Sequence, residues 1–89
     1  MKKIINKANK AIDIIIKASQ SSEPSKFFGR KFDDIFENGN SKEIVCEIVK
    51  KYLNDTALQK AVSKVDHWIG IDGWIKTYNK NYSTFAHRF

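Results

Sequence analysis

The chain has few of the residue types that form cross-links or bind metals. Its 89 residues include one cysteine, two histidines and one proline. A single thiol, Cys46, cannot form an internal disulfide, and one thiol with two widely spaced histidines cannot complete a structural zinc site. We therefore expect no metal and no cofactor, and a reducing compartment, the cytoplasm, as the setting.

Long apolar runs are also missing. Charged residues at positions 7, 10, 13 and 17 interrupt the isoleucine-rich start of the chain, whereas a membrane-spanning helix needs roughly 20 mainly apolar residues. We expect neither a signal peptide nor a transmembrane helix. Docking of the first helix on a membrane surface is disfavoured, because its apolar face is needed to cover the core.

Groups that could carry catalysis are few and scattered. A reaction needs a nucleophile, a base or a metal set whose members can meet. His67 and His87 both fall on polar helix faces, and Asp33, Asp34 and Glu37 form the one acidic cluster. This cluster lies among basic residues, as is typical of a solvated face of mixed charge. We therefore expect a protein that is not an enzyme.

The sequence is rich in apolar residues at helical spacing. Counted at about 100° per residue, they gather on one side of each of five stretches. These stretches are residues 3–19, 24–37, 41–53, 56–69 and 74–89. No alternating run is long enough to indicate a strand. The pattern predicts an all-α single domain, residues 1–89, folded as a compact bundle of about five short amphipathic helices.

Residues of the capping type precede two of these helices. Thr56 with Gln59, and Asn40 with Glu43, have the spacing of a capping box, in which the first side chain bonds to the start of the helix. After the fourth helix, Gly70 suits the left-handed conformation that often ends a helix. We expect both capping boxes and the Gly70 stop to form.

Two features of the pattern predict how the helices pack. The short link 70–73, in which Asp72 can cap the last helix, predicts that the last two helices fold back on each other and share one core. In helix 41–53 the apolar residues spread over about 200° of the circumference. A helix of that kind must be covered on two sides, so we expect it to be the central helix.

The net charge of +6 is concentrated toward the two ends of the chain. In helix 3–19 the lysines form a stripe opposite the apolar face, and Ile14 falls in the middle of that stripe. Phe27 similarly lies off the apolar arc of the next helix. Each has a structural interpretation, as a lone surface isoleucine and as a phenylalanine packed under the first helix. Each also has a functional interpretation, as a contact with a partner.

A basic excess favours acidic partners, which include proteins, nucleic acids and anionic lipids. We favour a small interaction protein, an inhibitor, immunity or accessory factor of the phage, plasmid or bacterial type, that binds a larger protein with an acidic face. This interpretation assigns partner binding to Lys3, Lys7, Lys10, Ile14, Lys17 and Phe27.

Nucleic-acid binding is the alternative. It would use the lysine stripe of the first helix or a helix-turn-helix within residues 41–69, whose second helix shows polar residues that can reach bases or phosphates. That second helix is neutral overall and has no arginine, which argues against specific reading of DNA. The residues assigned to this alternative are Gln59, Lys60, Lys64, Lys76, Lys80 and Arg88.

One further pattern lies in the C-terminal part of the chain and consists of Asp55, Leu58, Ser63, Asp66, His67, Lys76, Tyr78, Lys80 and Ser83. These residues are similar to the C-terminal half of the Hha-type nucleoid modulators, small helical proteins that bind a partner protein. The sequence departs from that family at Trp68, Ile71, Tyr82 and Ala86, where the family has Arg, Glu, Pro and Trp. Because nothing upstream aligns, we assign the chain to no family.

Overall fold

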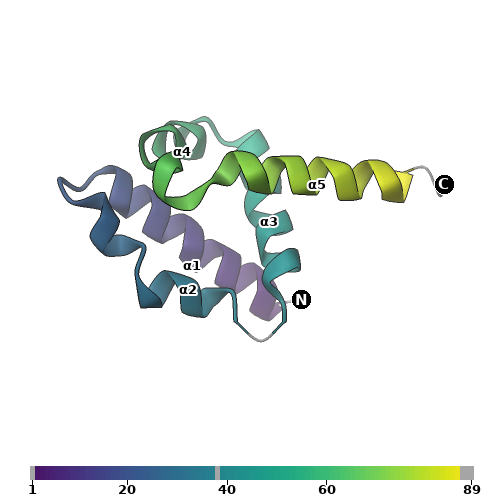
Figure 1. The fold of residues 1–89 in the computed structure, drawn as a ribbon, viewed down its shortest axis with the longest axis horizontal. Helices are drawn as coiled ribbons and strands as arrows, with labels where there is room; N and C mark the ends of the chain where they lie inside the picture. The colour runs from purple at the N-terminus through teal and green to yellow at the C-terminus, as the bar shows by residue number, and fades with distance from the viewer. Residues whose placement is uncertain (1, 38, 87–89) are drawn as a thin grey trace.

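Helices make up nearly all of the computed structural model, which describes residues 2–37 and 39–86, with side chains up to Tyr78. The elements are α1 (Lys2–Ser19), the 3-10 helix η1 (Pro24–Phe27), α2 (Arg30–Ile35), α3 (Ser41–Asn54), α4 (Thr56–Ile69) and α5 (Ile71–Ala86). Figure 1 shows their arrangement. The predicted all-α bundle is confirmed, with five α-helices and no strand in the part of the chain that is described.

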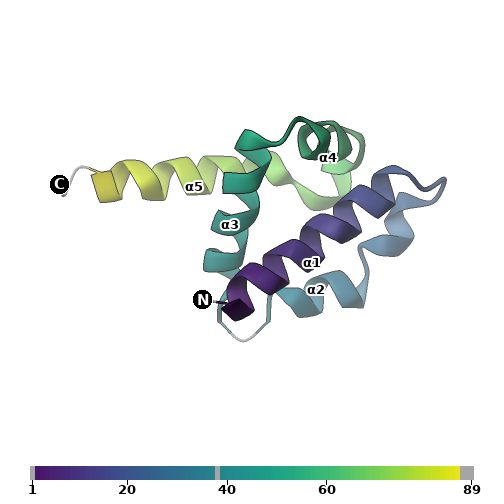
Figure 2. The same cartoon turned by 180° about the vertical axis from the view of Figure 1, so that it is seen from behind.

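The central helix is α1. It packs against η1, α2, α3 and α4, and Figure 2 shows it lying across the other helices. Its fully buried residues are mostly small, namely Ala8, Ala11, Ile15 and Ala18. The prediction that helix 41–53 is central was therefore wrong, although that helix, α3, is covered by α1, α4 and α5 as its wide apolar arc predicts. A wide apolar arc does not decide which helix is central, because a face of alanines lets several neighbours approach closely while contributing little apolar area.

The stretch predicted as one helix over 24–37 is split into η1 and α2. The chain bends at Phe28 and Gly29, and Gly29 becomes the residue that precedes α2, without a side-chain cap. Glycine weakens a helix at this point because it has the greatest backbone freedom. The phenylalanines still meet across the break: the ring centroids of Phe28 and Phe32 are 5.1 Å apart, as are those of Phe32 and Phe36.

The last two helices do not fold back on each other as predicted. Gly70 is the only residue between α4 and α5, with φ of +62°. The side chain of Asp66 accepts the N–H of Ile71 at 3.0 Å, so α5 begins at once and Asp72 lies in its first turn. A link this short makes α5 leave at an angle. It packs mainly on α3 and projects beyond it (Figure 1).

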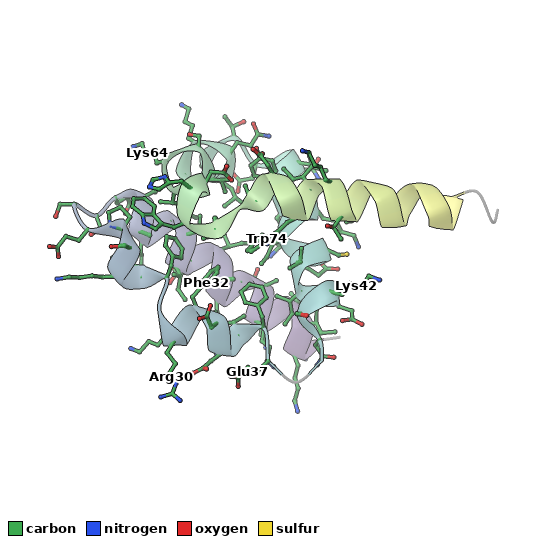
Figure 3. All side chains as sticks on the ribbon, viewed as in Figure 1. Arg30, Phe32, Glu37, Lys42, Lys64 and Trp74 are labelled. Carbon is green, nitrogen blue, oxygen red and sulfur yellow. The ribbon has the colours of Figure 1, made fainter. Side chains whose placement is uncertain are left out.

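Trp74 connects α5 to the rest of the core. Its ring is stacked on Phe32 with centroids 6.4 Å apart and lies 5.6 Å from the ring of Phe36. Figure 3 labels Phe32 on α2 and Trp74 on α5; Phe32 is buried and Trp74 is partly buried. On α4, helical spacing puts Trp68 on the apolar side of the stretch 56–69, yet this side chain is 40% exposed. The apolar side expected for the stretch 74–89 also includes Tyr82, Phe85, Ala86 and Phe89, whose side chains lie outside those described.

The two predicted capping boxes are absent from the described residues. The cap of α4 is Asp55, one residue earlier than predicted, and its carboxylate accepts the N–H of Leu58 at 3.1 Å. The side-chain amide of Gln59 instead donates to the carbonyl of Tyr52. Asn40 precedes α3 without a side-chain bond, because its backbone is at φ −103° and ψ 10° and not in the extended region that capping requires. The Gly70 stop is confirmed.

None of the helices in the described part of the chain is both long enough and apolar enough to span a membrane.

The cap of α4 can be tested by two single substitutions. We expect Asp55→Ala to lower the free energy of unfolding by about 1 kcal/mol, because the Leu58 N–H loses its acceptor. Thr56→Ala should change it by less than about 0.5 kcal/mol, since Thr56 is already inside the helix. Urea unfolding followed by circular dichroism measures both. A larger loss of unfolding free energy for Thr56→Ala than for Asp55→Ala would instead support the predicted capping box.

Two glycines near the start of α5 should respond in opposite directions. Gly70→Ala should destabilise the protein by about 1 kcal/mol, because a side chain disfavours positive φ. Gly73→Ala should stabilise it by about 0.5 kcal/mol, because Gly73 is helical and alanine is the better helix former. An added Cβ meets no atom within 4 Å at either position, so the difference isolates the backbone conformation. Equal effects in the same urea experiment would refute the left-handed link.

Candidate functional site

Two adjoining hollows lie beside α1 and share Ile14 and Lys31. The first, of about 400 Å³, lies between α1 and α2, and the second, of about 600 Å³, lies between α1, η1 and the start of α2. We call them together the Ile14 groove. Its lining residues are Lys7, Lys10, Asp13, Ile14, Lys26, Phe27, Gly29, Arg30, Lys31, Asp34 and Ile35.

The floor of the groove is apolar. Ile35 is almost fully buried, and Ile14 and Phe27 are partly buried and pack against the core. Ile14 is therefore not a fully exposed side chain within the lysine stripe, because α2 and η1 cover part of it. The packing of Phe27 agrees with the structural interpretation given to it. Both residues nevertheless keep a surface that faces the groove.

The walls of the groove carry positive charge from two elements of the fold. Lys7 and Lys10 come from α1, and Arg30 and Lys31 come from α2. Among the side chains described, none of these four takes part in an ion pair. Lys26 does form one, with Glu23 at 2.6 Å, but both groups are largely exposed. Such surface pairs contribute little and open readily.

The two carboxylates that line the groove are confined to its α1–α2 half. Asp13 and Asp34 line that half, and Asp13 is 2.9 Å from Lys17 in an exposed pair one helical turn away. The other half contains Lys26, Arg30 and Lys31 and no carboxylate. The groove is thus strongly cationic at the Phe27 end and mixed in charge at the other end.

The structure brings four of the six predicted partner-binding residues to this groove. Ile14 and Phe27, singled out separately as off-pattern, both line it, together with Lys7 and Lys10. Lys3 and Lys17 are exposed on α1 but do not line it.

The cations that α2 and η1 contribute to this groove were not predicted from the sequence. Lys26, Arg30 and Lys31 all occur within four residues of Phe27, and that local spacing was the available signal. It was hidden because Asp33, Asp34 and Glu37 follow closely and cancel the positive charge of the segment 24–37.

The residues of the nucleic-acid alternative lie elsewhere. Lys60, Lys64 and Lys76 are exposed, and Figure 3 shows Lys64 and Arg30 at opposite edges of the molecule. Gln59 is exposed, but its amide is engaged with the carbonyl of Tyr52. The side chain of Lys80 and the whole of Arg88 lie outside the described residues.

The predicted helix-turn-helix corresponds to α3 and α4. These helices contact each other and are joined by Asp55 alone, whereas that motif usually has a turn of about three or four residues. The exposed face of α4 carries Lys60 and Lys64. Two lysines on a helix that also contains Asp66 give only a weak positive field for a phosphate backbone.

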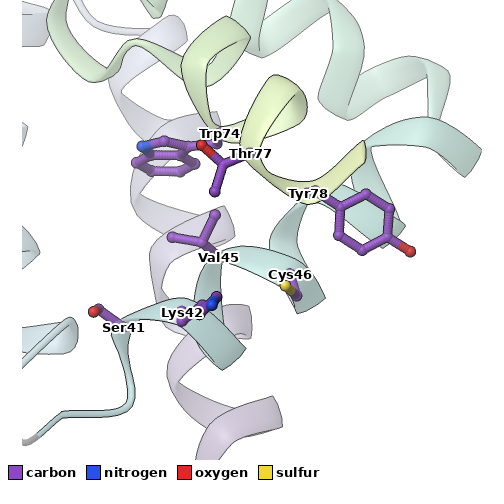
Figure 4. Close-up of a pocket in the computed structure, with 7 residues that line it drawn as sticks. All are labelled: Ser41, Lys42, Val45, Cys46, Trp74, Thr77 and Tyr78. Carbon is purple, nitrogen blue, oxygen red and sulfur yellow. The ribbon is translucent and has the colours of Figure 1, made fainter. Parts of the chain in front are cut away.

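A smaller pocket of about 160 Å³ lies between α3 and α5 (Figure 4). It contains Val45, the free Cys46, Trp74 and Tyr78. No cluster of His, Cys, Asp and Glu that could hold a metal occurs among the residues described. The pocket has the size and polarity to admit one apolar side chain.

Comparison of the chain with protein-family models, with curated proteins and with solved structures finds no significant match. The candidate site therefore has to be judged from its own residues. Judged in this way, the Ile14 groove is the largest concave surface described above that combines an apolar floor with charged walls.

Ile14 and Ile15 are neighbours on α1, and substituting each in turn distinguishes a residue of the groove from a residue of the core. Ile15→Ala should lower the free energy of unfolding by about 2–5 kcal/mol, because Ile15 is fully buried. Ile14→Ala should cost about 1 kcal/mol, because part of that side chain already faces solvent. Thermal or urea unfolding of the two variants measures the difference. If Ile14→Ala lowers the free energy of unfolding as much as Ile15→Ala does, Ile14 is a core residue and does not form the apolar floor of the groove.

Proposed function

We propose that the chain is a small non-enzymatic interaction protein that binds a larger protein with an acidic face, as an inhibitor, immunity or accessory factor of the phage, plasmid or bacterial type. The observation that carries this proposal is the meeting of Ile14 and Phe27 in one groove with cationic walls. Apolar residues at the centre and charged residues at the rim are the usual anatomy of a protein interface.

The composition of the groove favours a protein over a nucleic acid. Asp13 and Asp34 line it together with the cations, and they would repel a phosphate backbone, whose charge is uniform. A protein surface can place neutral or basic residues opposite these carboxylates and acidic residues opposite the lysines. Phe27 is packed against the core, so it offers less ring surface for stacking on a base than an exposed aromatic would.

Nucleic-acid binding is the second candidate. It is supported by the exposed Lys3, Lys10 and Lys17 on α1 and by the exposed Lys60 and Lys64 on α4. A cytoplasmic setting belongs to either proposal. It rests on the single thiol, Cys46, which has no partner for a disulfide within the chain.

Two variants with equal loss of charge can distinguish the candidates. The first changes Lys3, Lys7, Lys10 and Lys17 to Gln, and the matched control changes Lys42, Lys60, Lys64 and Lys76 to Gln. All eight lysines are exposed or partly exposed, so both variants should fold. We expect a partner captured from a lysate of the native host to be lost from the first variant and kept by the control, because the cationic wall on α1 is removed only in the first.

The same proteins are then titrated with mixed-sequence DNA and RNA over a range of salt concentrations. On the favoured proposal no binding at micromolar concentration occurs even at low salt. Micromolar binding that weakens steeply with salt and disappears in the first variant would show that the lysine stripe binds nucleic acid. Loss of nucleic-acid binding in the control variant alone would assign that binding to the lysines of α3, α4 and α5 and contradict the favoured proposal.

A further inference from the structure

We infer that the Ile14 groove binds a short acidic segment of the partner protein, in which one large apolar side chain lies over Ile14 and carboxylates flank it. This inference rests on the proposed function and specifies the chemistry of the partner. It follows from the size of the groove, the placement of its charges and the openness of its floor.

The size of the groove fits a peptide segment. Its two halves, of about 400 and 600 Å³, are in the range of sites that enclose several side chains. They share Ile14 and Lys31, so a bound chain can run continuously from one half to the other. The shared point is where an apolar side chain finds the exposed part of Ile14.

The charges define what must flank that apolar side chain. Lys7 and Lys10 lie on one wall and Arg30 and Lys31 on the other. A carboxylate on either side of the anchor can therefore meet a cation, and the planar Arg30 guanidinium can hold one through paired hydrogen bonds. These four cations have no ion-pair partner among the described side chains, so binding need not break an existing pair.

The distribution of carboxylates makes the two ends of the segment unequal. The end over Phe27 is lined by Lys26, Arg30 and Lys31 and by no carboxylate. Lys26 pairs with the exposed Glu23 outside that lining, and Arg30 and Lys31 have no ion-pair partner among the described side chains, so this end of the segment can be acidic at successive positions. The end between α1 and α2 also meets Asp13 and Asp34, so it must alternate acidic with neutral residues. A uniform polyanion fits only the first end.

Gly29 keeps the Phe27 end open to a backbone. It is exposed, lines the groove, and has no atom within 4 Å of the position that a Cβ would occupy. A peptide main chain can therefore approach the bend between η1 and α2 more closely than a side chain there would allow.

The test uses nuclear magnetic resonance of the full chain with labelled isoleucine methyl groups. The first probe is a short peptide amide with leucine at its centre and Asp and Glu on both sides. The second replaces the leucine with serine, and the third is a single-stranded oligothymidylate of similar charge. We expect saturable shifts of the Ile14 methyl resonances with the first probe, at a dissociation constant of about 1 mM or tighter. The methyl resonances of Ile5, which is exposed outside the groove, should not move.

The serine peptide should bind about tenfold more weakly, because the apolar anchor is lost. Arg30→Gln combined with Lys31→Gln should weaken the leucine peptide by about tenfold. The matched variant with Lys60→Gln and Lys64→Gln, which loses the same charge on α4, should weaken it less than about twofold. Circular dichroism checks that both variants are folded.

Three results would overturn the inference. They are the absence of any Ile14 shift with the leucine peptide, equal binding of the serine peptide or the oligothymidylate, and equal weakening by the α4 variant. The proposed function fails separately, when no host protein depends on the α1 lysines. A host partner that is lost from the α1 quadruple variant but kept by the Arg30 and Lys31 variant would preserve the function and refute the groove as its site.

Discussion

The fold depends on the close packing of neighbouring helices against the small-residue face of α1. Ala8, Ala11 and Ala18 are fully buried with Ile15 between them, and their small side chains allow η1, α2, α3 and α4 all to contact this one helix. In a domain of this size the buried apolar area is limited, so stability rests on packing density more than on the bulk of any single residue. The same arrangement leaves the lysines of α1 on the outside and creates the groove where α2 and η1 do not fully cover Ile14.

The helices themselves could be predicted because each follows from local periodicity, and α1, α3 and α4 begin and end within a residue of the predicted positions. Their packing could not be predicted in the same way. Asp55 and Thr56 are adjacent and both are of a type that can cap α4. The structure shows Asp55 as the cap. Because the N–H of Ile71 donates to Asp66, α5 begins directly after Gly70 and the expected link 70–73 does not form. With so short a link, α5 leaves α4 at an angle. Neither the cap bond of Asp55 nor the bond between Ile71 and Asp66 follows from the spacing of apolar residues along one helix, so periodicity does not detect them.

The candidate site was partly predictable for the same reason. Ile14 and Phe27 were found because each breaks the apolar pattern of its own segment. Both residues line one groove because the chain bends at Gly29. The apolar periodicity predicted one unbroken helix over 24–37 and did not indicate this bend. Arg30 and Lys31 were missed because a count of charge over the whole segment cancels them against Asp33, Asp34 and Glu37. The fold places only one of those three carboxylates, Asp34, in the groove.

The position of Cys46 makes its thiol a chemical probe of the contact between α3 and α5. It is the only thiol in the chain, and it lies in the small pocket where α5 rests on α3 (Figure 4). The side chain is only partly exposed there, so a bulky alkylating reagent reaches the sulfur more slowly while α5 rests on α3. The rate of alkylation, compared with that of an unstructured thiol, therefore reports how well the contact between α3 and α5 shields this thiol.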